Sequence, residues 1–177
     1  RLPLPAASAD VVVSGLVLNF VPQPELALAE MARIVRPAGT VAIYVWDYAG
    51  EMQLIRRFWD AAAELDPQSA TLDEGRRFPV CNPRALEALF RDAGFGQVES
   101  RAIDVATRFR NFEDYWTPFL GGQGPAPGYA MSLREARRER LRERLRDQLP
   151  TAPDGSIDLI ARAWAVRAVK TSGTAGT

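Results

Sequence analysis

The strongest constraint on the fold is a strand–helix–strand pattern between residues 11 and 46. Residues 11–18 form a nearly continuous apolar run rich in β-branched side chains, which is typical of a strand buried on both faces of a parallel sheet. Residues 40–46 (TVAIYVW) form a second run of the same type. Between them, residues 22–36 show helical spacing and end at Pro37-Ala38-Gly39. A crossover of this length joins parallel strands, so the chain is predicted to have an α/β fold.

The remainder of the chain predicts further helices, two more strands and an insertion between those strands. Helical patterns cover about 51–65 and the residues after Asn82-Pro83, where Asn82 is a predicted N-cap and Gly94 a predicted stop. Strands are expected at 97–106 and 157–169. The other expected features are a polar loop at 67–77, a short aromatic helix at 112–119 capped by Asn111, a Gly/Pro-rich loop at 121–128, and a charged helix running from a capping box, Ser132 to Glu135, to about 149.

Composition narrows the classes of function. Lys+Arg and Asp+Glu both number 22, and this balance argues against a nucleic-acid or anionic-membrane binder. No apolar run approaches the roughly 18 residues of a membrane span. The single cysteine, Cys81, excludes an intramolecular disulfide and indicates a reducing cytoplasm. Because the chain has no histidine, serine and cysteine triads and the usual zinc sites are not expected, and no metal site is predicted.

The first 48 residues resemble a known family. The matching segments are Leu2-Pro3-Leu4, residues 9–12 (ADVV) and residues 30–39 (EMARIVRPAG). This series resembles class I S-adenosylmethionine-dependent methyltransferases of the small-molecule type, related to ubiquinone and menaquinone biosynthesis enzymes. The sequence departs from the family pattern at Ala38, where glycine is usual, and at Asn19, where histidine is common.

The resemblance implies a Rossmann-like sheet and transfer of a methyl group from S-adenosylmethionine to a small-molecule acceptor. In that family the glycine-rich loop and the acidic residue for the ribose would precede Arg1. The resemblance therefore predicts an incomplete sheet and an N-terminally truncated fragment. The expected domain is 1–170, with a helical substrate cover at about 108–156 inserted between the last two strands, followed by a disordered tail at 171–177.

Cofactor residues are expected at the end of the first strand. Open parallel sheets bind ligands beyond the carboxyl ends of their strands, and glycine there lets a ligand approach the backbone closely. The resemblance implies that Ser14, Gly15 and Leu16 touch the methionine part of S-adenosylmethionine. It also implies that Arg1 and Leu2 lie against the adenine.

Substrate residues are expected next to this strand end. Asn19 and Phe20 follow the cofactor strand, and Trp46 and Tyr48 follow the next strand at the same sheet edge. Trp116 belongs to an aromatic group in the insertion, where the family builds its substrate cover. Core packing is the alternative for these aromatic side chains. Asp47 has two interpretations, a helix cap or a general base. No catalytic residue is assigned, because alignment of the reactants can supply much of the rate of an in-line displacement.

Two alternatives stay open at the level of the sequence. A parallel sheet without its first strands exposes an unpaired edge, so the chain could be a non-catalytic remnant or an interaction module that self-associates through that edge. The arginine-rich helix at 132–149 could bind an anionic partner such as RNA, or it could be a solvated helix with internal ion pairs. The zero net charge favours the solvated helix.

Overall fold

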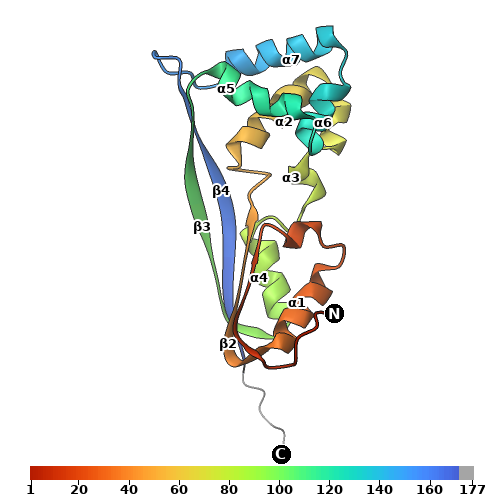
Figure 1. Cartoon of the computed structure of the whole chain (residues 1–177), viewed down its shortest axis with the longest axis vertical. Coiled ribbons are helices and arrows are strands. Elements are labelled where there is room, and N and C mark those ends of the chain that lie inside the picture. The colour runs from red at the N-terminus through yellow and green to blue at the C-terminus, as the bar shows by residue number, and fades with distance from the viewer. Residues whose placement is uncertain (172–177) are drawn as a thin grey trace, which may run out of the picture. The chain divides into compact units, whose positions relative to one another are not determined.

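The computed structural model describes residues 1–171 and divides the chain into two compact units (Figure 1). The sheet unit comprises residues 1–46, 80–103 and those from 163 onward, and the helical unit comprises residues 47–79 and 104–162. Of the predicted tail, residues 172–177 lie outside the described part of the chain. Thr171 is described, and its Oγ1 donates a hydrogen bond to the carbonyl of Gly94 at 3.1 Å.

In residues 1–171, four strands are separated by helical segments: two between the first and second strands, four between the second and third, and four between the third and fourth. They are β1 (Ala9–Gly15), η1 (Leu18–Phe20), α1 (Pro24–Ile34), β2 (Val35–Trp46), α2 (Gln53–Leu65), η2 (Pro67–Thr71), α3 (Glu74–Arg77), α4 (Pro83–Asp92), β3 (Phe95–Phe109), α5 (Phe112–Trp116), η3 (Thr117–Gly121), α6 (Pro125–Ser132), α7 (Glu135–Gln148) and β4 (Ile157–Lys170).

The predicted parallel strand pair is present in the sheet unit. The described strands have the order β1-β2-β4-β3. β1 pairs with β2 in parallel, with Val11 opposite Thr40 and Gly15 opposite Tyr44, and α1 forms the crossover between them. β4, the last strand of the chain, pairs with β2 in antiparallel orientation, with Thr40 opposite Val169. The strand–helix–strand prediction is therefore confirmed.

The two faces of this sheet differ in burial. α1 and α4 lie together against one face (Figure 1), where the strand side chains and their helical neighbours are almost fully buried. This core contains Leu28, Ile34, Val41, Ile43, Val45, Leu86, Phe90 and Val166. On β1, by contrast, Val11 is 56% exposed and Val13 is 63% exposed. The prediction that the first strand is buried on both faces is wrong, because these valines lie on the face of β1 that α1 and α4 do not cover.

The helical unit is built around an aromatic core. The rings of Phe58 and Phe119 stack with centroids 4.5 Å apart, and Trp59 packs edge-on against Phe58 at 5.2 Å. α2, α5, α6 and α7 supply most of the buried side chains. The outer side of α7 carries ion pairs, among them Arg142 with Glu139 at 2.9 Å. This arrangement is the one expected for a solvated, ion-paired helix.

Most predicted helix starts carry their expected caps. The Asn82 side chain accepts a hydrogen bond from the Ala85 amide at 2.9 Å where α4 begins. Asn111 accepts one from the Asp114 amide at 2.9 Å where α5 begins. Gly94 has a φ of +79°, as expected for a residue that ends a helix.

Two loop predictions and one capping box are wrong. The expected polar loop at 67–77 contains η2 and α3, because Asp66 and Asp73 cap their first turns. The expected loop at 121–128 ends at Gly124, since Pro125 occupies the first position of α6. Ser132 is the last residue of α6, and its hydroxyl donates back to the Tyr129 carbonyl at 2.7 Å instead of capping α7.

Candidate functional site

The carboxyl end of β1 is closed by a tyrosine from β2. Gly15 lies opposite Tyr44, and the Leu16 amide donates to the Tyr44 carbonyl at 2.8 Å. A Cβ at position 15 would collide with the Tyr44 phenol and lie 2.8 Å from its Cε1 atom. The Tyr44 ring thus accounts for the glycine, and the close approach of a ligand predicted from the sequence is not needed to explain it. Tyr44 was not among the predicted site residues.

Backbone strain and an unpartnered polar group follow this strand end directly. Leu16 has a φ of +56°, a left-handed conformation that costs a non-glycine residue of order 1 kcal/mol. Asn19, in η1, is only 9% exposed, and its side-chain Nδ2 has no hydrogen-bond partner in the part of the chain that the structure describes. A buried donor left unpaired costs about 1–3 kcal/mol, and such groups are typical of ligand sites.

Two predicted aromatic residues of the sheet unit lie at the ends of the paired strands, Phe20 shortly after β1 and Trp46 at the end of β2. Phe20 is the last residue of η1 and is 61% exposed. Trp46 is the last residue of β2, pairs with Ala163 of β4 and is partly buried. Since strand side chains alternate between faces, Tyr44 and Trp46 project on the same side of β2. That alternation in the sequence IYVW is the signal that could have added Tyr44 to the predicted site.

Side chains of α1 hold the N-terminal segment in place. The Leu2 amide donates to Glu30 Oε1 at 2.7 Å, and Arg33 Nη2 donates to the Leu4 carbonyl at 2.9 Å. Arg33 Nε also donates to Glu30 Oε2 at 2.8 Å, and these hydrogen bonds lower the pKa of Glu30 to about 2. Leu2-Pro3-Leu4 and the Glu30–Arg33 pair, two separate parts of the predicted motif, are therefore one structural feature. Arg1 borders a hollow of about 330 Å³ next to this feature.

Pro37-Ala38-Gly39, in the irregular first part of β2, combines a positive φ at one residue with a close backbone contact at the next. Ala38 has a φ of +62°, the region that favours glycine. Gly39 has a different constraint, because a Cβ there would lie 2.8 Å from the Asp10 carbonyl and 2.9 Å from the Arg36 carbonyl. Glycine therefore stands at position 39, where there is no room for a Cβ, while alanine stands at position 38, where the positive φ would favour glycine.

The remaining predicted residues belong to the helical unit. Tyr48 is half-buried and its ring lies 5.7 Å from that of Phe78. Trp116 is 3% exposed and packs in the aromatic core, so its burial favours the core-packing alternative. Asp47 is buried and its Oδ2 accepts a hydrogen bond from the Glu51 amide at 3.0 Å, which favours the structural alternative over a general base.

Residues 1–171 have neither a cluster of metal ligands nor a helix suited to cross a membrane. They contain no group of three or more His, Cys, Asp or Glu side chains arranged to hold a metal ion. No helix among these residues has the length and apolar character needed to cross a membrane.

Comparisons with known sequences place the N-terminal segment. Residues 1–43 match the family model described as a methyltransferase domain. A ubiquinone/menaquinone biosynthesis C-methyltransferase of Sinorhizobium fredii is 30% identical over 110 residues, covering 55% of this chain and 42% of the relative. An arsenite methyltransferase of Halobacterium salinarum is 30% identical over 109 residues, covering 62% of this chain and 25% of the relative. The chain thus spans less than half the length of these curated relatives.

Solved structures show the same fold over nearly the whole chain. A putative methyltransferase from an antibiotic biosynthesis pathway of Anabaena variabilis superposes with a TM-score of 0.54 at 18% identity, covering 93% of this chain and 69% of that one. A putative methyltransferase of Bacillus halodurans gives 0.53 at 13% identity, covering 97% and 68%. The fold is therefore the Rossmann-like fold of methyltransferases. The match of residues 1–43 to the methyltransferase domain model confirms the predicted resemblance for that segment.

Proposed function

We propose that this chain takes part in the transfer of a methyl group from S-adenosylmethionine to a small-molecule acceptor. The observation that carries the proposal is the carboxyl end of β1, where the left-handed Leu16 and the buried, unpartnered Asn19 amide occur within four residues. This strand end lies inside the segment that matches the methyltransferase domain model. Strain and unsatisfied polarity at the ligand-binding edge of a parallel strand pair are expected where a bound molecule completes the site.

The cofactor side of the site is assigned to the strand end and the N-terminal segment. Ser14, Gly15 and Leu16 are proposed to contact the methionine part, and Arg1 and Leu2 the adenine side. The residues present fit such a group, since Asn19, which is assigned to the substrate side, closely follows the strand end and its buried Nδ2 could also donate to an acceptor atom of the cofactor. When bound, S-adenosylmethionine supplies an electrophilic methyl group.

The substrate side is assigned to residues that follow the two strands. Asn19, Phe20 and Trp46 are proposed to line it in the sheet unit, where the exposed Phe20 offers an apolar wall. Tyr48 and Trp116 of the helical unit stay predictions, and the burial of Trp116 weighs against its part. These residues would orient the acceptor and exclude water, because alignment alone supplies much of the rate of an in-line displacement.

The proposal also includes self-association of the chain through β1 and a location in the cytoplasm. The exposed valines of β1 and its position at the edge of the described sheet support self-association through this strand. The single cysteine, Cys81, is buried, which supports a reducing compartment such as the cytoplasm.

Calorimetric titration with S-adenosylhomocysteine tests the cofactor assignment. We expect saturable binding to the 177-residue chain, weakened about tenfold in Asn19→Ala by loss of one charge-assisted hydrogen bond. Gln123→Ala, an exposed amide of the helical unit, is the control and should bind as the parent does. Absence of saturable binding would overturn the proposal in favour of a non-catalytic remnant. Equal binding by Asn19→Ala and the parent would remove Asn19 from the site.

A further inference from the structure

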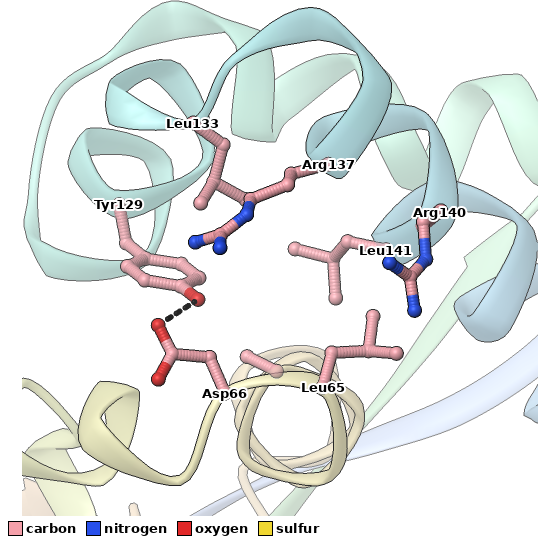
Figure 2. A pocket seen from close by; sticks show the side chains of 8 residues that line it. Leu65, Asp66, Tyr129, Leu133, Arg137, Arg140 and Leu141 are labelled. Carbon is pink, nitrogen blue, oxygen red and sulfur yellow. Dashed lines mark hydrogen bonds between the residues drawn. The ribbon is translucent and has the colours of Figure 1, made fainter.

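The helical unit contains a small hollow that the proposed function does not use (Figure 2). It lies where the end of α2 faces α6 and the first half of α7. Its apolar lining consists of Ala62, Leu65, Leu133 and Leu141, and its volume is about 80 Å³. A hollow of this size accommodates several water-sized groups, which corresponds to a compact body of a few carbon atoms.

One wall of the hollow is fixed by its own hydrogen bonds. The Tyr129 hydroxyl donates to Asp66 Oδ2 at 3.4 Å, and Asp66 Oδ1 accepts from the Gln68 amide at 3.1 Å (Figure 2). The Tyr129 ring also packs against Trp59 of the aromatic core at 5.7 Å. Both oxygens of the Asp66 carboxylate are therefore engaged, and the wall is formed before any ligand arrives.

Two arginines of α7 line the hollow without ion pairs. Figure 2 shows the Arg137 guanidinium directed toward Tyr129 and Asp66, with Arg140 on the far side of Leu141. Neither arginine has an ion-pair partner among residues 1–171, whereas further along the same helix Arg142, Arg144 and Arg146 each have one. Arg140 also borders a shallower hollow with Glu139, Glu143 and Asp147 on its rim, so Arg137 is the better-defined of the two cations.

We propose that this hollow binds a small monocarboxylate with a compact branched apolar body. The two guanidinium groups and the Asp66 carboxylate leave one net positive charge around the hollow, which matches a monoanion. A planar guanidinium fits a carboxylate better than it fits a compact neutral group. The leucines and Ala62 bury the apolar body while Arg137 faces the carboxylate, and Arg140 adds positive charge on the far side of Leu141. This inference is independent of methyl transfer, because every lining residue belongs to the helical unit.

The test is a titration of the isotopically labelled 177-residue chain with isovalerate, followed by amide and indole chemical shifts. We expect saturable shifts at Tyr129, Leu133 and Leu141 and at the indole of Trp59, with a dissociation constant of about 1 mM or below. Isovaleramide has the same shape without the charge, and formate has the charge without the apolar body. Each should bind at least about tenfold more weakly than isovalerate.

Two matched arginine variants, one in α7 and one at its N-cap, test whether the Arg137 guanidinium binds the carboxylate. Arg137→Met removes the guanidinium but keeps the apolar stem, and it should weaken isovalerate binding about tenfold or more. Arg134→Met is the control, since Arg134 is an exposed arginine outside the hollow, and it should leave binding within about twofold. Equal binding by Arg137→Met and the parent, equal binding of isovaleramide and isovalerate, or the absence of saturable shifts would each overturn the proposal.

Discussion

The sheet unit and the helical unit differ in how much large apolar surface they leave exposed. In the helical unit, Phe58, Trp59, Tyr115 and Phe119 are each at most 1% exposed. In the sheet unit, Val11, Val13 and Phe20 are more than half exposed, and the strained Leu16 and the unpartnered Asn19 amide occur in the same stretch of chain. The comparison shows that the stretch around the end of β1 combines exposed apolar side chains with a buried amide that has no partner in the described chain, whereas the large aromatic side chains of the helical unit pack against one another.

The largest expected effect separates buried from exposed aromatic residues. Phe58→Ala should destabilise the chain by about 3–5 kcal/mol, because it leaves a cavity in the stacked core next to Phe119. Phe20→Ala, at a 61% exposed site, should change stability by no more than about 0.5 kcal/mol. Urea unfolding followed by circular dichroism measures both. Similar losses in the two variants would break the contrast between the units.

The next effect tests the close approach in the irregular first part of β2, at Gly39. Gly39→Ala should cost about 2–3 kcal/mol, because the new Cβ meets backbone carbonyls of Asp10 and Arg36 that cannot rotate away. Gly121→Ala is the control, since no atom lies within 4 Å of its added Cβ, and its stability should stay within about 0.5 kcal/mol of the parent. Thermal unfolding of both proteins gives the comparison. If Gly39→Ala left the stability unchanged, the Asp10 backbone of β1 would have to move away from the new Cβ at little cost.

At position 38, one residue before Gly39, a substitution is expected to raise the stability, by less than Gly39→Ala lowers it. Ala38→Gly should stabilise the chain by about 1 kcal/mol, because glycine adopts a φ of +62° without the steric cost that alanine has. Ala136→Gly, in the exposed face of α7, should instead destabilise it by about 1 kcal/mol. The two denaturation midpoints should therefore move in opposite directions. A destabilised Ala38→Gly would refute the assigned strain.

The smallest effect concerns a buried carboxyl of the helical unit. Burial raises the pKa of Glu74 above its ordinary value, although the Trp59 indole donates a hydrogen bond to its carboxylate. The folded state therefore binds the Glu74 proton more tightly than the unfolded state does. Its contribution to stability is fully present below the unfolded pKa and is lost as pH rises through the folded pKa.

Glu74→Gln should remove that part of the pH dependence. Urea midpoints measured from about pH 4 to about pH 8 should fall less steeply for the variant than for the parent over the window above the unfolded pKa. Glu135→Gln, at an exposed position in α7, is the matched control. Parallel pH profiles for Glu74→Gln and the parent would mean that Glu74 ionises without cost in its buried position.

The sequence predicted elements that depend on local patterns. The two apolar runs, their crossover helix and the Asn82 and Asn111 caps rest on neighbouring residues, and the structure confirms them. The failures depend on distant residues or on competing local signals. The choice of which sheet face the helices cover decides that the valines of β1 stay exposed, and Pro125 starts a helix in which the Ser132 hydroxyl donates back to the Tyr129 carbonyl.

The candidate site divides in the same way. The strand end at Ser14–Leu16 followed from the motif, because a glycine after a buried run marks a strand terminus. Tyr44 was missed because its position over Gly15 arises from pairing between strands that are 29 residues apart at that point. The missing partner of the Asn19 amide cannot be predicted from the sequence, since hydrogen-bond satisfaction is a property of the assembled structure.

The strand order has a consequence for synthesis of the chain. β4 is made last, yet it lies between β2 and β3 in the sheet. Until residues 157–170 leave the ribosome, β2 lacks its antiparallel neighbour and the sheet remains divided. The helical unit has most of its core residues earlier in the chain, and helical contacts are more local. A nascent chain should therefore assemble most of its helical core before its sheet closes, with Ile157 and Leu159 of β4 joining that core last, and chaperone protection would matter most for β2 during that interval.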